Sequence, residues 1–381
     1  MKRMLPAFAL SLLALTSAHA ADETMMAKPA KKTNQNLDLV TKNSDGSGVT
    51  VRGEFLYLHT RQDGNLYAVT ESATTTTTAT PLVANSGTAQ YNGERWQAGF
   101  RLGFGYQFDH DEWDMQLNWA HLFNKNSNKE IKGTILSSLT NPAYTLQGLP
   151  LLTPTTMVMA SQANSTWNIK TDILDLEIGK EYAPMNSGAM ASTMFTVRPH
   201  FGLRYAKLTQ NLKATYLHSV APVAPATTPE TVTDVVTNSQ DFKGIGIRGG
   251  VDAEYGFGSG FLVYGKLAAS LLAGKFEVTA AEDVLANPGI GTAPATFLGN
   301  KTATKANTKS LKAVTDIDLG IGWEKMFADG KYNLRLNLGW EQHIFFNHNQ
   351  MLRFANTAGN ALNANGDLAF SGLKFAVEFG F

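Results

Sequence analysis

The sequence predicts a transmembrane β-barrel of antiparallel strands, and three observations support this fold class. Every second residue from Trp96 to Phe108 is apolar, with polar residues and glycines between. The same alternation restarts at Trp113 and runs to Trp119. Tryptophan and phenylalanine lie at the ends of these runs, where the aromatic girdles of a membrane barrel are found. Period-two alternation of this kind fits a strand with lipid on one face and water on the other.

The N-terminus has the features of a secretion signal. A basic start is followed by an apolar run from Met4 to Leu15 and a small-x-small cleavage site that ends at Ala20. We expect residues 1–20 to be a removed signal peptide and residues 21–48, which are polar, to be a periplasmic arm. Residues 49–381 then form one barrel domain, because no linker or change of composition divides them. An exported barrel of this kind is expected in the outer membrane of a bacterium.

Composition narrows the function classes. The chain has 32 basic and 32 acidic residues, so its formal net charge of zero provides no electrostatic basis for nucleic-acid binding. Cysteine is absent, so stability must come from a closed hydrogen-bond ladder and not from disulfides. No later stretch has the roughly 18 apolar residues that a membrane helix needs, so strands must cross the membrane.

Ten segments carry the alternating pattern and give the expected strands. Their expected bounds are residues 49–62, 96–108, 113–120, 166–182, 193–208, 242–255, 261–277, 311–327, 332–346 and 368–381. Short turns alternate with long connections at residues 72–93, 124–165, 209–241, 278–310 and 347–367. Bacterial outer-membrane barrels place the short turns in the periplasm and the long loops outside, and they have an even strand number.

Two segments leave alternatives open for the strand count. Asp63-Gly64 is a hairpin signal that would separate a further strand ending near Glu71. We expect the first strand to continue instead, because an extra hairpin would exchange the sides of the short and long loops. The connection 124–165 is long enough to contain another hairpin or to fold into the lumen, so twelve or more strands remain an alternative.

The polar face of the strands carries charges of both signs, which lipid cannot accommodate. They are therefore candidates for lining the lumen. Either they line a water-filled path and bias which ions pass, or they form a salt-bridged plug in a narrow barrel. The candidate pore-lining residues are Arg101, Asp175, Glu177, Arg198, His200, Arg204, Arg248, Asp252, Glu254, Asp316, Asp318, Arg335 and Glu341.

Counting outward from the turn between the fourth and fifth strands gives a specific register. It places Glu177 opposite Arg198 and Asp175 opposite His200, with an uncertainty of two residues from the irregular turn. Replacing Arg198 by Glu is then expected to shift ion selectivity towards cations and leave the barrel folded.

Motifs for other chemistry are weak. Residues 244–249 spell the dinucleotide pattern GxGxxG, but they lie inside an alternating strand and lack the helix that the pattern requires. His343 and His348 with Glu341 have no assured shared geometry for a metal. No spacing identifies a catalytic set, so we expect no enzyme activity, cofactor or metal, although an outer-membrane enzyme remains an alternative.

Several stretches resemble the Legionella-type major outer membrane protein family, which includes pore-forming proteins of environmental chlamydiae. They include Gly53-Glu54-Phe55-Leu56-Tyr57, Gly103-Phe104-Gly105-Tyr106, Arg198-Pro199-His200-Phe201-Gly202-Leu203-Arg204, Gly244-Ile245-Gly246-Ile247-Arg248-Gly249-Gly250-Val251-Asp252, Ala269-Ser270-Leu271-Leu272-Ala273-Gly274-Lys275-Phe276, Leu319-Gly320-Ile321-Gly322-Trp323-Glu324 and Leu338-Gly339-Trp340-Glu341. The resemblance covers most of residues 51–381 and leaves out the long loops.

The resemblance implies a general diffusion pore with no catalytic residues. Its implied partners are outer-membrane lipid, small hydrophilic solutes or ions, and the barrel-assembly machinery, which recognises an aromatic-ended last strand such as the one ending at Phe381. The lack of cysteine argues against a disulfide-linked envelope lattice. A homo-oligomer stays open, and the alternative function is a structural or adhesive barrel with partner-binding loops.

Overall fold

A computed structural model describes eleven ranges of the chain: 48–71, 87–92, 95–108, 113–123, 127–137, 160–182, 194–220, 230–287, 300–328, 331–354 and 361–381. All of them fall within one compact unit. The predicted signal peptide and all but the last residue of the predicted arm lie outside the described residues, so both stay predictions. Among the described residues, no helix is long and apolar enough to cross a membrane.

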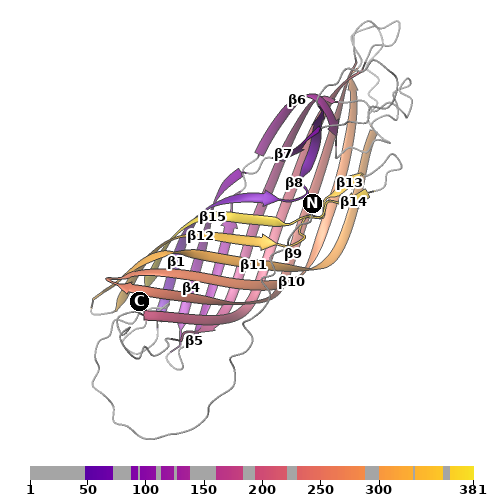
Figure 1. Cartoon of the computed structure of the whole chain (residues 1–381). Coiled ribbons are helices and arrows are strands. Elements are labelled where there is room, and N and C mark those ends of the chain that lie inside the picture. Colours follow the sequence, from indigo (N-terminus) through magenta and orange to yellow (C-terminus); the bar gives the residue numbers. More distant parts are fainter. Residues whose placement is uncertain are drawn as a thin grey trace, which may run out of the picture. The chain divides into compact units, whose positions relative to one another are not determined.

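Ten antiparallel strands close into a barrel, which confirms the predicted fold class (Figure 1). In the order of the ring they are β1 (Gly48–Gln62), β4 (Arg95–Gln107), β5 (Trp113–Leu122), β7 (Ala160–Lys180), β8 (Met194–Val220), β9 (Glu230–Gly258), β10 (Phe261–Asn287), β11 (Asn300–Phe327), β12 (Tyr332–Phe345) and β15 (Leu368–Gly380). The pairings β7–β8 and β1–β15 complete the ring, so every strand has two neighbours in the barrel wall.

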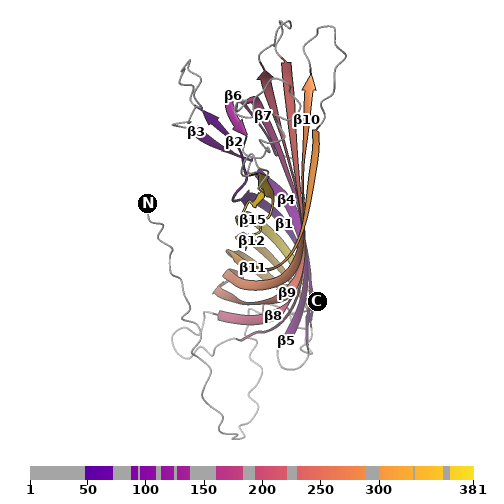
Figure 2. The ribbon, with the colours of Figure 1, turned by 90° about the vertical axis from the view of Figure 1, so that its right-hand side faces the viewer.

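Strands β8 to β11 are much longer than the sequence pattern indicated, at 27 to 29 residues each. They pair with one another far beyond the level where β12 ends beside Val314 (Figure 2). The predicted loops 209–241 and 278–310 are therefore mostly strand, and that part of the prediction is wrong. The reason is compositional: small and polar residues face outward there, so the alternation no longer resembles a membrane strand.

Three further strands extend this sheet. β6 (Ser127–Ser137) pairs with β7 above the end of β5, and it lies in the predicted loop 124–165. β2 (Leu66–Glu71) pairs with β6 and with β3 (Gly87–Tyr91). The first strand thus stops at Gln62 and a separate strand follows Asp63-Gly64, contrary to our expectation. The sides of the loops are not exchanged, because β2 leaves the barrel wall and adds no strand to the ring.

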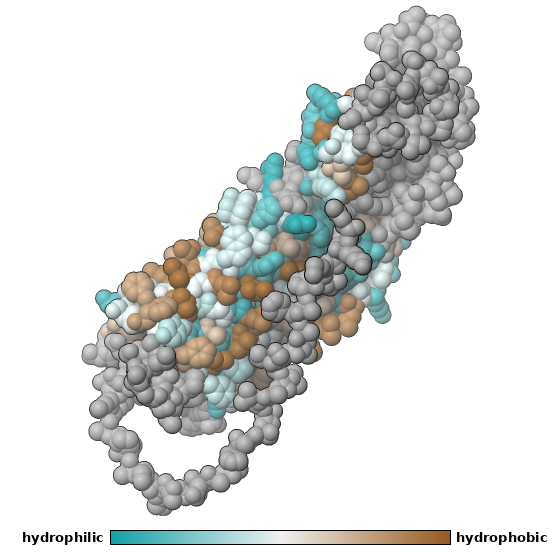
Figure 3. All heavy atoms as spheres, in the orientation of Figure 1, coloured by the Kyte–Doolittle hydropathy of each residue, from teal (hydrophilic) through white to brown (hydrophobic). Residues whose placement is uncertain are grey.

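Along the long strands the outward face changes from apolar to polar, and the inward face changes from charged to apolar. On β8 the outward side chains from Phe195 to Tyr205 include large exposed apolar residues, over a stretch of eleven residues. About 9–11 residues are needed to cross a bilayer as a tilted strand. From Lys207 to Thr215 the outward residues of β8 are polar. We call the part of the barrel at the level of Phe195 to Tyr205 the membrane zone, and the part beyond it the outer zone. Figure 3 shows apolar residues gathered on the outer surface of the barrel strands.

The interior of the outer zone is an apolar core. Phe242, Phe276, Phe345, Phe370 and Leu212 are at most 3 % exposed. The aromatic rings of Phe242 and Phe276 are tilted by 38° to each other, with their centroids 4.6 Å apart. This core provides the enclosed apolar surface that a soluble protein buries, although it lies inside a barrel.

The described parts of the chain between β12 and β15, residues 346–354 and 361–367, fold into this interior. It carries a short ribbon of β13 (Leu352–Phe354) and β14 (Ala361–Asn363). Gln240 Nε2 donates to the carbonyl of His348 at 3.0 Å, and the amide of Gln350 donates back to Gln240 Oε1 at 2.7 Å. Asn238 Nδ2 donates to the carbonyl of Leu352 at 3.2 Å. We call the described residues 346–354 and 361–367 the inner segment. Such a fold into the lumen was predicted, as an alternative, only for the connection 124–165.

Candidate functional site: the charged lumen of the membrane zone

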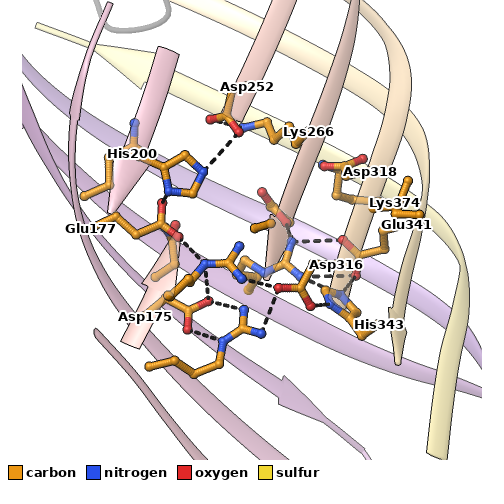
Figure 4. Close-up of a pocket in the computed structure, with 18 of the residues that line it drawn as sticks. Asp175, Glu177, His200, Asp252, Lys266, Asp316, Asp318, Glu341, His343 and Lys374 are labelled. Carbon is orange, nitrogen blue, oxygen red and sulfur yellow. Dashed lines mark hydrogen bonds and ion pairs between the residues drawn. The ribbon is translucent and has the colours of Figure 1, made fainter. Parts of the chain in front are cut away.

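All thirteen predicted pore-lining residues lie on the inward side of the barrel wall, where most of them form ion pairs with other strands. Figure 4 labels Asp175, Glu177, His200, Asp252, Asp316, Asp318 and Glu341 among them. Period-two alternation explains this placement, because lipid-facing residues at odd positions of β8 put Arg198, His200 and Arg204 on the opposite face. Whether they line a conducting path is a question of function and is taken up below.

One network joins β7, β8, β9 and β11. Arg204 Nε lies 2.6 Å from Asp175 Oδ1, and Arg204 Nη1 lies 2.8 Å from Asp316 Oδ2. Arg248 Nε lies 2.5 Å from Glu177 Oε1, and its Nη1 pairs with the same Asp316 carboxylate. Asp316 thus bridges two guanidinium groups across the lumen. Such charge-assisted, multiply bonded pairs are the strong class of hydrogen bond.

A second network lies across the lumen and centres on Arg101. Its guanidinium makes two hydrogen bonds to Glu341, at 3.0 and 3.1 Å, and pairs with Glu54 on β1. His343 links the two networks, with Nδ1 2.6 Å from Asp316 Oδ1 and Nε2 3.2 Å from Glu341 Oε1. Charges of opposite sign therefore meet across the barrel, and not only between neighbouring strands.

A third group holds the periplasmic end of the lumen. Arg198 is 0 % exposed; its Nε donates to Asp114 at 2.7 Å and its Nη1 donates to Asp252 at 3.3 Å. Arg335 pairs with Glu254. Arg198 therefore acts as a clamp between β5, β8 and β9 and does not face open water. Contrary to the sequence-based expectation for Arg198→Glu, we expect its replacement to destabilise the barrel.

Between the networks lies a polar cavity of about 80 Å³, enough for a few water molecules. Lys266 on β10 is the most exposed charged side chain among those paired there, at 28 %, and its Nζ is 3.7 Å from Asp252. A lumen filled by ion pairs with room only for water agrees with the interior that a small barrel is expected to have.

The predicted register of β7 against β8 is wrong by four residues. Asp175 lies opposite Arg204, and Glu177 lies opposite Gly202. Tyr182 bridges to Val197 beyond the end of β7, so the midpoint of the connecting segment is not the axis of the hairpin. Counting from that midpoint assumed a symmetric turn, which an irregular connection does not provide.

Sequence reasoning missed several charged residues of the lumen. They are Arg52, Glu54, Asp114, Lys266, Lys374 and Glu378. A usable signal existed for the last two: lipid-facing Phe375, Val377 and Phe379 leave Lys374 and Glu378 on the inward side of β15. Arg52 and Glu54 alternate in the same way with Val51 and Phe55 on β1.

The weak motifs have structural explanations. Gly246, in the GxGxxG pattern, lies on β9, and a Cβ there would come within 1.8 Å of the carbonyl oxygen of Leu271 on β10. Close approach of two strands therefore explains this glycine. His343 is bonded to Asp316 and Glu341, whereas His348 lies in the apolar core. Within the described ranges, no group of three or more His, Asp or Glu residues is arranged to hold a metal.

A closed ring with an apolar outer belt and a charged lumen defines an outer-membrane β-barrel. The family model described as Legionella pneumophila major outer membrane protein precursor matches residues 44–381. The chain therefore belongs to this family of outer-membrane proteins, which confirms the resemblance seen in the sequence. No curated protein matches the chain.

Three solved barrels show distant likeness. A FadL homologue of Pseudomonas aeruginosa has 7% identity over 88% of this chain and 90% of its own, with a TM-score of 0.25. The toluene transporter TodX of Pseudomonas putida has 8% identity over 89% and 90%, with a TM-score of 0.21. The outer membrane protein OmpT of Vibrio cholerae has 8% identity over 88% and 99%, with a TM-score of 0.15. Scores this low carry no argument about function.

Proposed function

We propose that the barrel is a narrow pore for ions and small hydrophilic solutes. The observation that carries this proposal is the composition of the lumen in the membrane zone: it is lined by charges of both signs and encloses a polar cavity of about 80 Å³. Charged rings are the usual means by which a pore selects ions. Membership of a major outer membrane protein family supports a bulk role of this kind. The proposal assigns no catalytic residue.

The size of the cavity limits what passes. Only water and small ions fit between the networks in this conformation, so larger solutes require the ion pairs to rearrange. The inner segment also fills the outer zone above the networks, with Met351 2 % exposed and His348 0 % exposed. We therefore propose that the described conformation is closed, and that movement of the inner segment opens the path to the outside.

Planar-bilayer recording of the refolded full chain tests the proposal. Single-channel steps in the wild type are expected to be small and brief. The double variant N238A/Q240A removes the amide contacts to His348, Gln350 and Leu352, so it should lengthen the open time. The control is Q210A, because Gln210 faces inward directly beside Gln240 and its side chain makes no hydrogen bond to the described residues of the inner segment. Silence in all three proteins, with folding verified by a heat-dependent gel shift, would contradict the pore.

A structural barrel is the second candidate function, and one observation favours it. The lumen charges are paired across the barrel and the outer zone is a packed core, an arrangement that also suits a rigid scaffold for the loops. The two candidates differ in one outcome: a scaffold conducts in neither the wild type nor N238A/Q240A.

A further inference from the structure

Four lysines form one straight row on the outer surface of the barrel. Lys207 on β8 lies opposite Lys243 on β9, Lys243 lies opposite Lys275 on β10, and Lys275 lies opposite Lys309 on β11. All four side chains are exposed. We call them the lysine row. Neighbouring strands are about 4.8 Å apart, so the row covers roughly 15 Å of the barrel wall.

The lysine row lies at the edge of the membrane zone. The next outward row towards the membrane is Tyr205, Ile245, Ala273 and Leu311, of which Ile245 and Leu311 are 58 % and 60 % exposed. The next row in the other direction is Thr209, Asp241, Glu277 and Asn307. The ammonium groups therefore lie where the outward surface changes from apolar to polar, on the side of the long hairpins. That level is the headgroup layer of the outer leaflet.

Neighbouring carboxylates compensate only part of the charge of this row, because Asp172 lies opposite Lys207 and Glu277 interacts with Lys275 and Lys243. Lys275 Nζ pairs with Glu277 Oε1 at 2.6 Å. Within the described part of the chain, no carboxylate lies within 4.0 Å of the Nζ atoms of Lys207, Lys243 or Lys309. Asp172 continues the row on β7, but it is bonded to His121 at 2.7 Å.

Like charges directly opposite each other destabilise a sheet. A lone lysine at this level needs no explanation, because its stem covers apolar surface and its ammonium reaches water. Four in direct register on adjacent strands repel one another, and an external anion at that level would remove the repulsion. Lysine is a common binder of phosphate, acting as a point charge.

We propose that the lysine row is a binding site for the phosphate groups of outer-leaflet lipids. The ammonium groups hold the phosphates, and the apolar row beneath contacts the acyl chains of the same lipid. The site combines basic residues with an adjacent apolar surface, which is the arrangement that recognises anionic headgroups. The site is independent of the pore, because its side chains lie on the opposite face of the wall from the lumen.

The test compares lipid retention by the full-length protein in detergent. The variant K207Q/K243Q/K275Q/K309Q removes the row, and K132Q/K213Q/K325Q/K331Q removes four exposed lysines of the described chain that lie away from it. The probes are lipopolysaccharide, the same lipid after dephosphorylation, and inorganic phosphate. Bound lipid per chain is counted by native mass spectrometry, and the temperature of the heat-dependent gel shift is recorded in parallel.

We expect wild type and control to retain phosphorylated lipid and the row variant to bind it at least about tenfold more weakly. Dephosphorylated lipid should bind all three proteins weakly. Equal retention by the row variant and the control, or equal retention of both lipids by the wild type, overturns the proposal. Protection from heat by inorganic phosphate alone, at the level given by the lipid, assigns the site to free phosphate and overturns the lipid assignment. The milder variant K243Q/K309Q keeps the test decisive if the fourfold variant does not fold.

Discussion

The membrane zone and the outer zone use the same strands in opposite ways. On β8, Leu203 faces lipid while Arg204 faces the lumen, but a few residues further Asn211 faces water while Leu212 faces the core. The hydrogen-bond ladder and the side-chain phase continue unbroken through the change. Only the solvent outside has changed, from lipid to water. Lipid excludes charges from the outer face and confines them to the lumen, whereas water allows the barrel to keep its apolar residues inside.

The interiors of the two zones are consequently stabilised by different interactions. The membrane zone relies on ion pairs, which stabilise the fold only while each charge keeps its partners. The outer zone relies on apolar packing, which is less directional. Substitutions in the two zones should therefore differ in their cost to stability.

Breaking a clamp of the membrane zone should have the largest effect. In Arg198→Met, Asp114 and Asp252 lose a fully buried guanidinium partner. Removing one member of a buried ion network typically costs about 3–5 kcal/mol. The free energy of unfolding in urea, measured on protein refolded into vesicles, checks this. The control is Arg61→Met, whose pair with Asp63 is 63 % and 52 % exposed and is expected to contribute about 1 kcal/mol or less. Equal losses in both variants would show that the lumen network does not hold the barrel together.

Placing a lysine on the outer face of each zone should lower the free energy of unfolding by different amounts in the two zones. Ile247 on β9 is 66 % exposed in the membrane zone, and Ser239 faces outward on the same strand in the outer zone. Ile247→Lys should cost about 2–4 kcal/mol if it lies near the middle of the bilayer. Ser239→Lys should change stability by about 0.5 kcal/mol or less, because it faces water. The same urea titration in vesicles measures both, and similar costs would place the edge of the membrane elsewhere.

The change in polarity of the two strand faces between the zones also explains which parts of the fold could be predicted from the sequence. The membrane parts of all ten ring strands were found because exposed residues such as Phe104 and Leu117 alternate with polar ones. The outer halves of β8 to β11 were missed because residues such as Thr209 and Ala214 give a weak pattern of the opposite sign. The alternation of side chains along each strand was enough to predict which charged residues face inward. Their partners did not, because Arg204 meets Asp316 across the lumen, and no local pattern encodes a contact between β8 and β11.

Lowering the pH should destabilise the packing of the inner segment in the outer zone, because His348 becomes protonated. Burial among Phe242, Phe276 and Phe345, with Lys312 as the nearest charge, lowers the pKa of His348 to about 3. Lys312 also donates to the Asn347 carbonyl, and Asp367 accepts from the Asn347 amide at 2.7 Å. Because the pKa is about 6.5 in the unfolded chain, neutral His348 favours the folded state above pH 6.5, and this contribution is lost progressively as the pH falls towards 3.

At pH 5 the loss is about 2 kcal/mol, or roughly thirtyfold in an opening equilibrium. Hydrogen exchange of the Asn349 amide, which donates to the Gly366 carbonyl, reports the opening. After correction for the intrinsic exchange rate, protection should fall between pH 7 and pH 5 in the wild type and stay nearly constant in His348→Leu. An equal fall in both proteins would assign the effect to other titrating groups.

The smallest effect on stability, and the most informative for function, should come from Lys266. Its side chain is 28 % exposed and makes one loose ion pair, with its Nζ 3.7 Å from Asp252, so it should stabilise the network less than the buried arginines do. Lys266→Glu changes the charge of the lumen by two units but places a carboxylate opposite Asp252 and Asp318. The stability comparison therefore uses Lys266→Gln, which should cost about 1 kcal/mol or less. Reversal potentials in a salt gradient should then shift towards cation selectivity, with Lys266→Gln intermediate. Lys325→Glu, on the outward face of β11, serves as the control because its side chain points away from the lumen. A shift of equal size in that control would mean that surface charge, and not the lumen, sets the selectivity, and an unchanged potential in all three variants of a conducting protein would place the ion path outside the charged networks.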